Sequence, residues 1–202
     1  MSVESRIVYF DKPGWRCTDE VLAICRQRAA ELGIKTAVVP SVTGSTALKA
    51  LDVLQGMKLV IVTAHTGYAR ANLQSFPEAR RRELVAKGVP VLTAPHVFGG
   101  LSYAMRDMYG TAMLGVDMGN ALRTLGQGMK VVIECPMAAM DAGLLTWGEE
   151  ILSMGGTNRG VDTAVTLRPV HVRDFFALRV NEILCKPRFD PDDPPTAGQK
   201  SS

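Results

Sequence analysis

Short runs of β-branched and aliphatic residues alternate with longer helical stretches along this chain, and this alternation constrains the fold most strongly. The first such runs are Ile7–Phe10, Thr36–Pro40, Leu59–Thr63 and Val89–Thr93. Apolar runs separated by helical patterns are typical of a sheet that is covered by helices on both faces. We therefore expect an α/β fold, a three-layer αβα sandwich with a mostly parallel sheet.

Three further runs, Val131–Cys135, Thr163–Leu167 and Glu182–Cys185, also fit strands, and residues 136–154 fit a loop and a helix. The last two strands have no helix of normal length between them, so we expect an antiparallel edge. We expect Val131–Cys135 and Leu59–Thr63 to lie on either side of Thr36–Pro40. Strand order would then reverse beside Thr36–Pro40, and ligands of such folds bind at this reversal.

Helical patterns fill the remaining stretches. The expected helices are Thr18–Leu32, Ala47–Gln55, a charged helix from Pro77 to Gly88, a Gly- and Met-rich helical region Gly99–Met113, and a short helix from Asp117 to Gly126. Arg80-Arg-Arg82 fits a solvated helix face, because no interleaved aromatic residues accompany it. Met105, Met108, Met113 and Met118 are expected to pack in a core or a subunit interface, which leaves a homo-oligomer open.

The chain length of 202 residues suits one domain of ordinary size. We assign residues 1–187 to a single α/β domain and residues 188–202 to a flexible C-terminal tail. The tail is rich in Pro and Asp and has no apolar stripe, so its deletion should leave thermal stability nearly unchanged.

Composition narrows the classes of function. The formal net charge of +3 is too small for a dedicated nucleic-acid or membrane-surface protein, and no apolar run is long enough for a membrane helix. Four cysteines without a C-x-x-C pair, and three scattered histidines, predict reduced thiols and no metal site. The N-terminus lacks a secretory pattern, so we expect a cytoplasmic protein without nucleic-acid or membrane partners.

The most distinctive polar segment is Ser41-Val-Thr-Gly-Ser-Thr46, between a predicted buried strand and a predicted helix. A helix N-terminus presents free N–H groups and a partial positive charge. Gly44 would let the backbone approach a ligand, and the hydroxyls of Ser45 and Thr46 would add donors. These features favour a phosphate site, but Ser and Thr also serve as helix caps without any ligand. The sequence leaves both interpretations open.

Two other loops carry candidate ligand-binding side chains. His65 follows the next strand and could act as an acid, a base or a hydrogen-bond donor, or could simply be satisfied by loop backbone. Gly155-Gly-Thr-Asn-Arg-Gly160 is glycine-rich, and Arg159 offers a fork of donors suited to phosphate. A flexible surface turn would have the same composition. Neither loop matches the spacing of a dinucleotide fingerprint.

Four blocks of the sequence form a specific combination: Val8-Tyr-Phe-x-Lys-Pro-Gly14, Thr63-x-His-Thr-Gly67, Gly155-Gly-x-x-Arg-Gly-x-Asp-Thr-Ala164 and Arg168-Pro-x-His171. With these blocks the chain resembles a family of small stand-alone proteins similar to the C-terminal α/β domain of pyruvate kinase. In pyruvate kinase a Ser/Thr–Gly–Ser/Thr loop, to which residues 41–46 are similar, holds the phosphate of an allosteric sugar bisphosphate. The resemblance does not imply kinase activity, because the catalytic barrel has no counterpart in this sequence.

The resemblance implies that the chain binds flavin mononucleotide (FMN), as members of the small family do. The implied phosphate-binding residues are Ser41, Gly44, Ser45 and Thr46. The implied contacts of the flavin ring and ribityl chain are Thr63, His65, Thr66 and Gly67, with His65 as the candidate catalytic residue. The pocket would be closed by Met137 in the loop after Cys135 and by Gly155, Gly156, Asn158 and Arg159.

Two functions follow as hypotheses. The first is a flavoprotein with FMN at the reversal of strand order, with oxidoreductase activity an open question. The alternative is a non-enzymatic sensor or regulatory module for a phosphorylated metabolite. In both, the partner is a small phosphorylated ligand.

Overall fold

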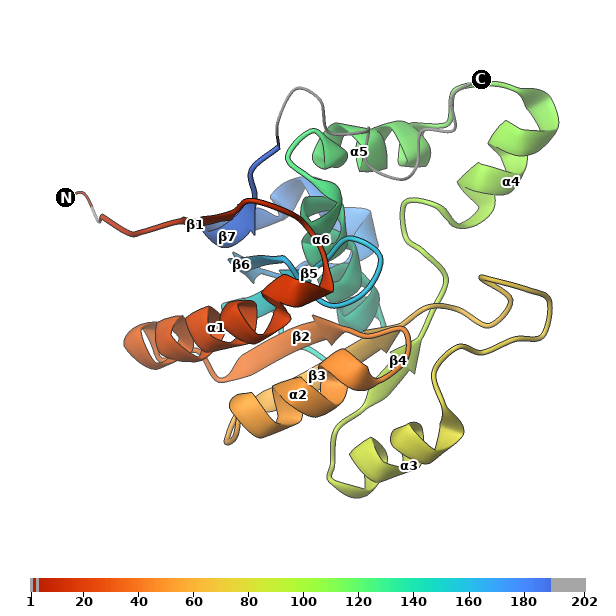
Figure 1. The fold of residues 1–202 in the computed structure, drawn as a ribbon. Coiled ribbons are helices and arrows are strands. Elements are labelled where there is room, and N and C mark those ends of the chain that lie inside the picture. The colour runs from red at the N-terminus through yellow and green to blue at the C-terminus, as the bar shows by residue number, and fades with distance from the viewer. Residues whose placement is uncertain (1, 3, 190–202) are drawn as a thin grey trace.

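Within residues 2 and 4–189, which the computed structural model describes, seven strands form one sheet in the order β1-β7-β6-β5-β2-β3-β4 (Figure 1). The strands are β1 (Val8–Phe10), β2 (Thr36–Pro40), β3 (Lys58–Thr63), β4 (Val91–Thr93), β5 (Ile151–Gly155), β6 (Thr163–Arg168) and β7 (Arg179–Pro187). Strand β6 is antiparallel to β5 and to β7, and the other neighbouring pairs are parallel.

The sheet confirms the expected α/β class with a mostly parallel sheet and an antiparallel part. The antiparallel pairs lie in the half of the sheet that ends in β1, which pairs in parallel with β7 at that edge. The expected pairing of β2 with β3 is also confirmed, with Val38 opposite Val60. Strand β2 is nearly completely buried, as expected when both faces of a sheet are covered.

Helices cover both faces of the sheet (Figure 1). One face is covered by α1 (Thr18–Leu32), α2 (Ser45–Val53) and α3 (Glu78–Ala86), whose apolar residues share one core with Ala37, Val39 and Ile61. The other face is covered mainly by α6 (Gln127–Asp141), which packs with α5 (Leu114–Arg123) around a second core. The remaining helix, α4 (Gly100–Tyr109), contacts α5 and buries none of its residues. Short 3-10 turns η1 (Trp15–Cys17) and η2 (Val172–Ala177) complete the elements.

The prediction of a strand at Val131–Cys135 is wrong, because these residues lie in the middle of α6. Strand β5, in a stretch predicted as loop and helix, occupies the expected place beside β2. A helix buried on most sides is apolar on most sides, so a short window of it has the composition of a buried strand. Gly143 and Gly148 lie between α6 and β5, and two glycines in this stretch leave the end of the helix ambiguous in the sequence.

Pro136 lies inside α6, although a proline in a sequence usually indicates that a helix is interrupted. Pro136 has no N–H group, so the carbonyl of Val132 loses its partner within the helix. The hydroxyl of Ser153, on β5, donates a hydrogen bond of 2.7 Å to this carbonyl. The buried serine thereby satisfies the carbonyl that the proline leaves free and connects α6 directly to the sheet.

Arg188 continues the edge of the sheet beyond β7, because its N–H donates to the carbonyl of Phe10 at 2.9 Å. Residues 190–202, on which most of the prediction of a flexible tail rests, lie outside the described residues. None of the helices in the described residues combines the length and the hydropathy that crossing a bilayer requires.

Candidate functional site

A cavity of about 990 Å³ lies where strands β2, β3 and β5 end at the same edge of the sheet. The chain passes from β2 to β3 and β4 on one side and places β5 on the other, so strand order reverses between β2 and β5. Ligands of open α/β sheets bind in the crevice at such a reversal. The cavity is lined by residues that follow these strands, by α2 and by α6: Ser41, Val42, Thr43, Ser45, Thr46, Lys49, Thr63, Tyr68, Arg80, His96, Gln127, Lys130, Val131, Glu134, Cys135, Ala138, Gly156, Asn158 and Arg159 among others.

The segment after β2, residues 41–46, is called the β2 loop below. The hydroxyl oxygen of Ser41 accepts hydrogen bonds from the N–H groups of Gly44 at 3.1 Å and Ala47 at 3.3 Å, so Ser41 caps α2. Among the described residues, the N–H groups of Ser45 and Thr46 have no hydrogen-bond partner. The β2 loop therefore combines a satisfied cap with free donors at the start of α2, on the wall of the cavity.

Gly44 adopts a φ of 85°, which L side chains rarely adopt. A Cβ atom at this position would lie 2.7 Å from Cδ of Arg80 and 3.3 Å from the ring of Phe76. The glycine therefore permits both the turn of the β2 loop and the close packing of α3 against it.

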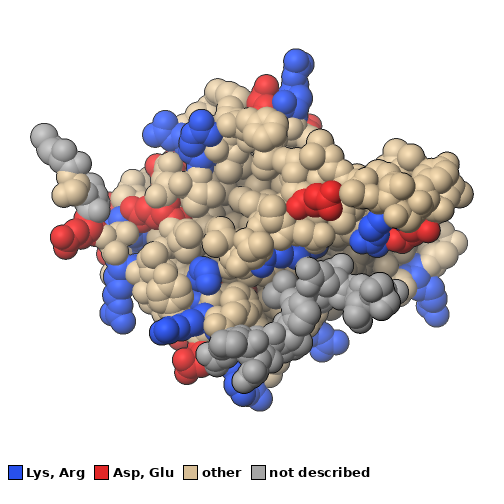
Figure 2. Space-filling model, turned by 90° about the horizontal axis from the view of Figure 1, so that it is seen from above, with Lys and Arg blue, Asp and Glu red and all other residues tan. Residues whose placement is uncertain are grey.

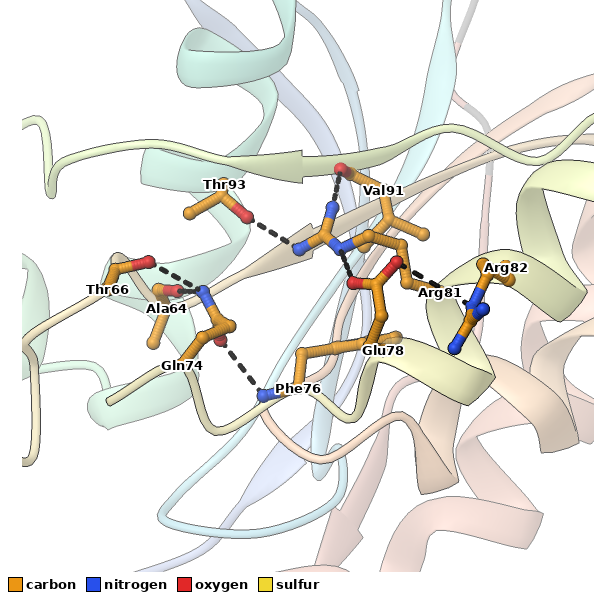
Figure 3. A network of polar contacts seen from close by, with 9 residues as sticks. All are labelled: Ala64, Thr66, Gln74, Phe76, Glu78, Arg81, Arg82, Val91 and Thr93. Carbon is orange, nitrogen blue, oxygen red and sulfur yellow. Dashed lines mark hydrogen bonds and ion pairs between the residues drawn. The ribbon is translucent and has the colours of Figure 1, made fainter. Parts of the chain in front are cut away.

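Arg80 brings a guanidinium group to the β2 loop. It donates to the carbonyl of Thr43 at 2.5 Å and to the hydroxyl of Ser45 at 3.2 Å. The prediction that Arg80-Arg-Arg82 form a solvated face is therefore wrong for Arg80. It is also wrong for Arg81, which donates to Val91 and Thr93 of β4 (Figure 3).

The residues after β3 only partly meet the cavity. Thr63 lines it and is 3% exposed, and its hydroxyl has no hydrogen-bond partner among the described residues. His65, Thr66 and Gly67 do not line it. Instead, Nδ1 of His65 lies 3.0 Å from the carbonyl oxygen of Thr66, which matches the interpretation of a histidine satisfied by loop backbone.

The loop after β3 is held by a side-chain amide. Gln74 donates to the carbonyl of Ala64 at 3.1 Å and to the hydroxyl of Thr66 at 3.4 Å, and accepts from the N–H of Phe76 at 2.9 Å (Figure 3). This arrangement uses the hydroxyl of Thr66 within the loop.

Two aromatic side chains take the place that the sequence suggested for His65. Tyr68 and His96 line the cavity, and their ring centroids lie 5.2 Å apart. His65 packs edge-on against both rings, at 5.4 Å from His96 and 5.6 Å from Tyr68. Burial lowers the pKa of His96, so its imidazole favours the neutral form. Both residues follow strands, Tyr68 after β3 and His96 after β4, but the sequence does not show which side chains of these connections turn toward the cavity.

The expectation that Met137 closes the pocket is not met. It was based on a loop after Cys135, whereas Met137 lies on α6, is fully buried in the core and does not line the cavity. Cys135 and Ala138 of the same helix face the cavity instead. Burial raises the pKa of the Cys135 thiol to about 12, which keeps it protonated at neutral pH.

The last residue of β5 and the segment after it, residues 155–160, are called the β5 loop below. Gly156, Asn158 and Arg159 line the cavity, whereas Gly155 lies behind it in contact with α6. The carboxylate of Asp162, completely buried, accepts from the N–H groups of Gly14 at 2.8 Å and Thr157 at 3.0 Å. The backbone donors of this loop are therefore partly used by a carboxylate of the protein itself.

The wall formed by α6 contributes a buried ion pair that the sequence analysis missed. Lys130 and Glu134 are 3% and 6% exposed, contact each other and line the cavity. Their i,i+4 spacing with opposite charges is a helical signal. That signal could have corrected the strand predicted at this position.

Charged side chains are otherwise dispersed. On the face shown in Figure 2, Lys and Arg alternate with Asp and Glu rather than gathering in one patch. Within the described residues, no group of three or more His, Cys, Asp or Glu side chains is arranged to hold a metal ion.

Comparison with solved structures finds pyruvate kinases from Cryptosporidium parvum. One aligns over 76% of this chain and 23% of its own, with 14% identity and a TM-score of 0.40. Another, in complex with ADP, aligns over 76% of this chain and 23% of its own, with 15% identity and a TM-score of 0.38. The chain thus spans about a quarter of the length of these enzymes, and a likeness of this degree carries no conclusion about activity or ligand. A comparison with known protein families found no match.

Proposed function

We propose that the cavity binds a small phosphorylated ligand, with the phosphate at the N-terminus of α2, and that this ligand is FMN. The observation that carries the proposal is that the N–H groups of Ser45 and Thr46 have no partner within the described part of the chain and lie at the wall of a cavity large enough for a small-molecule ligand. Thr63, which lines the same cavity and whose buried hydroxyl has no partner in the described ranges, is a second and independent sign of a polar ligand.

The physical case for phosphate rests on donors and charge. A dianion at a helix N-terminus gains about 0.3–2 kcal/mol from the helix dipole. Each hydrogen bond to a charged group adds about 1.5–3 kcal/mol. Arg80 lines the cavity and supplies a guanidinium group at the β2 loop, while Lys49, which also lines the cavity, pairs with Asp19 at 2.6 Å.

The cavity also offers groups that suit the rest of FMN. The hydroxyl of Thr63 could pair with a hydroxyl of the ribityl chain, and the rings of Tyr68 and His96 provide flat surfaces for the flavin. Bound FMN would supply redox chemistry, while these residues would orient the ring and exclude water. The identity of the ligand as FMN comes from the sequence resemblance, and the shape and polarity of the cavity are compatible with it.

The test is calorimetric titration of FMN and of inorganic phosphate into the protein and its Thr46→Glu variant. A glutamate beside the phosphate adds a like charge and removes a donor, so both affinities should fall roughly tenfold or more. Leu114→Glu is the matched control, because it places the same residue in the first turn of α5, where Leu114 is exposed. The control should bind both probes as the unmodified protein does.

Arg80→Met provides a second variant, since it keeps the aliphatic stem that packs on Gly44 and removes the guanidinium. Phosphate affinity should fall roughly threefold to tenfold. Unmodified protein that binds neither probe, or a Thr46→Glu variant that binds both normally, would show that the β2 loop serves only to cap α2. Binding of phosphate and a sugar phosphate without FMN would favour the metabolite sensor instead.

A further inference from the structure

The part of the cavity wall formed by α6 carries an ion pair that takes no part in the proposed phosphate site. Lys130 and Glu134 lie on one stripe of α6 with Gln127, Val131, Cys135 and Ala138, and all of them line the cavity. An isolated charge in this position would be costly, and a buried pair is tolerated when its hydrogen bonds are satisfied.

The two partners differ in how far they are satisfied. One carboxylate oxygen of Glu134 accepts from Lys130, and the other accepts from the N–H of Phe98 at 3.0 Å. Lys130 has three donors, and Glu134 is its one hydrogen-bond partner among the described residues. Its ammonium nitrogen lies 5.9 Å from the centroid of the Phe98 ring, which adds a weak attraction. Each carboxylate oxygen therefore has a donor, whereas the ammonium group at the cavity wall keeps donors without a partner among the described residues.

The ion pair and the phosphate site lie on different elements, so one ligand that contacts both must reach from α2 to α6. Helix α2 packs on one face of the sheet and α6 on the other, and the cavity reaches both across the ends of β2 and β3. A ligand whose phosphate binds at α2 would approach Lys130 with its opposite end.

We infer that Lys130 recognises the end of the ligand remote from its phosphate, by donating hydrogen bonds to a carbonyl or anionic oxygen, with Glu134 as the residue that positions it. The inference rests on the proposed function and adds to it a substrate class: phosphate esters that carry an oxygen acceptor at the far end. The carbonyl groups of a flavin ring belong to this class. Lys130 is then a specificity-determining residue, because it distinguishes such ligands from phosphate alone.

The test must remove the charge of Lys130 without leaving Glu134 charged and alone, since breaking a buried pair is strongly destabilising. The double variant Lys130→Met/Glu134→Gln does this, and its glutamine retains an acceptor for the N–H of Phe98. The matched control is Lys87→Met/Glu83→Gln, which changes an exposed i,i+4 pair on the surface of α3. Thermal unfolding shows that each variant is folded before titration.

The probes are FMN and inorganic phosphate, both followed by calorimetry. The cavity variant should bind inorganic phosphate as the unmodified protein does and FMN roughly tenfold more weakly, while the control variant is unchanged for both. A folded cavity variant that keeps its FMN affinity, or loses both affinities equally, overturns the inference and leaves the phosphate site standing. Unmodified protein that binds FMN no more tightly than inorganic phosphate also overturns it. Failure of the unmodified protein to bind either probe overturns the proposed function itself.

Discussion

The β2 and β5 loops follow neighbouring strands, line the same cavity and both combine glycine with threonine, yet a carboxylate of the protein uses a backbone donor of only the β5 loop. In the β2 loop the N–H groups of Ser45 and Thr46 are free among the described residues. In the β5 loop Thr157 donates to the carboxylate of Asp162, and Val161 just beyond the loop donates to the hydroxyl of Thr18. Glycine and hydroxyl content alone therefore does not identify an anion site.

The difference assigns separate roles to the two loops. Asp162 supplies the β5 loop with an anion from the protein itself, and this also joins the loop to Gly14 ahead of α1. A carboxylate that accepts several N–H bonds rigidifies the backbone around it. The β5 loop is therefore anchored at Thr157 by a carboxylate of the protein itself, whereas the donors of Ser45 and Thr46 at the start of α2 meet no anion among the described residues.

The largest expected effect comes from removing the internal anion. Asp162→Ala leaves the N–H groups of Gly14 and Thr157 without their acceptor and should lower the free energy of unfolding by about 3–5 kcal/mol. Urea unfolding measures this loss, with Asp107→Ala, at an exposed position, as the control. A loss near that of the control would show that the β5 loop does not depend on its carboxylate.

A smaller effect is expected from the backbone of the β2 loop. Gly44 and Gly67 have similar φ values, 85° and 90°, but a Cβ would clash with Arg80 only at Gly44 and meets open space at Gly67. Gly67→Ala should cost about 1 kcal/mol from backbone strain, and Gly44→Ala about 2 kcal/mol or more because Arg80 must also move. The same unfolding measurements compare the two variants. Equal losses would mean that α3 does not hold the β2 loop in place.

The smallest expected effect concerns His96, which lines the same cavity. Burial lowers the pKa of His96, so the unfolded chain takes up a proton near pH 6.5 while the folded protein resists it. The stability contributed by the neutral imidazole is therefore present above about pH 6.5 and is lost as the pH falls below it. Unfolding free energies at about pH 7 and pH 5 should differ less in His96→Gln than in the unmodified protein. An unchanged difference would contradict burial of the neutral ring.

Much of the fold could be predicted because local patterns and final structure agree. Strands β2 and β3 are short, buried and rich in β-branched residues, and α1 begins and ends near its predicted residues. The error at α6 arose because burial on most sides removes the 3.6-residue period that reveals a helix. The glycines that flank α6 and the proline within it do not mark its two ends unambiguously in the sequence.

The candidate site was predictable where it depends on one loop and not where it depends on packing. The β2 loop and its place at the reversal of strand order follow from glycine, hydroxyls and a helix start in sequence. The selection of Tyr68 and His96 rather than His65 as cavity-lining residues depends on how the connections after β3 and β4 fold against each other. The anchoring of the β5 loop depends on Asp162, which accepts from Thr157 and also from Gly14, a residue distant in sequence.

The bond from the Ser153 hydroxyl to the carbonyl of Val132 also has a mechanical consequence. The proline at 136 opens one position in the hydrogen-bond ladder of α6, and a side chain from the sheet fills it. Any sliding of α6 along β5 would break that bond and leave a carbonyl unpaired in the core. This bond therefore fixes the position of α6 along the sheet at Val132, two residues beyond Lys130. The wall of the cavity that carries Lys130 is thereby held in place independently of the surrounding loops.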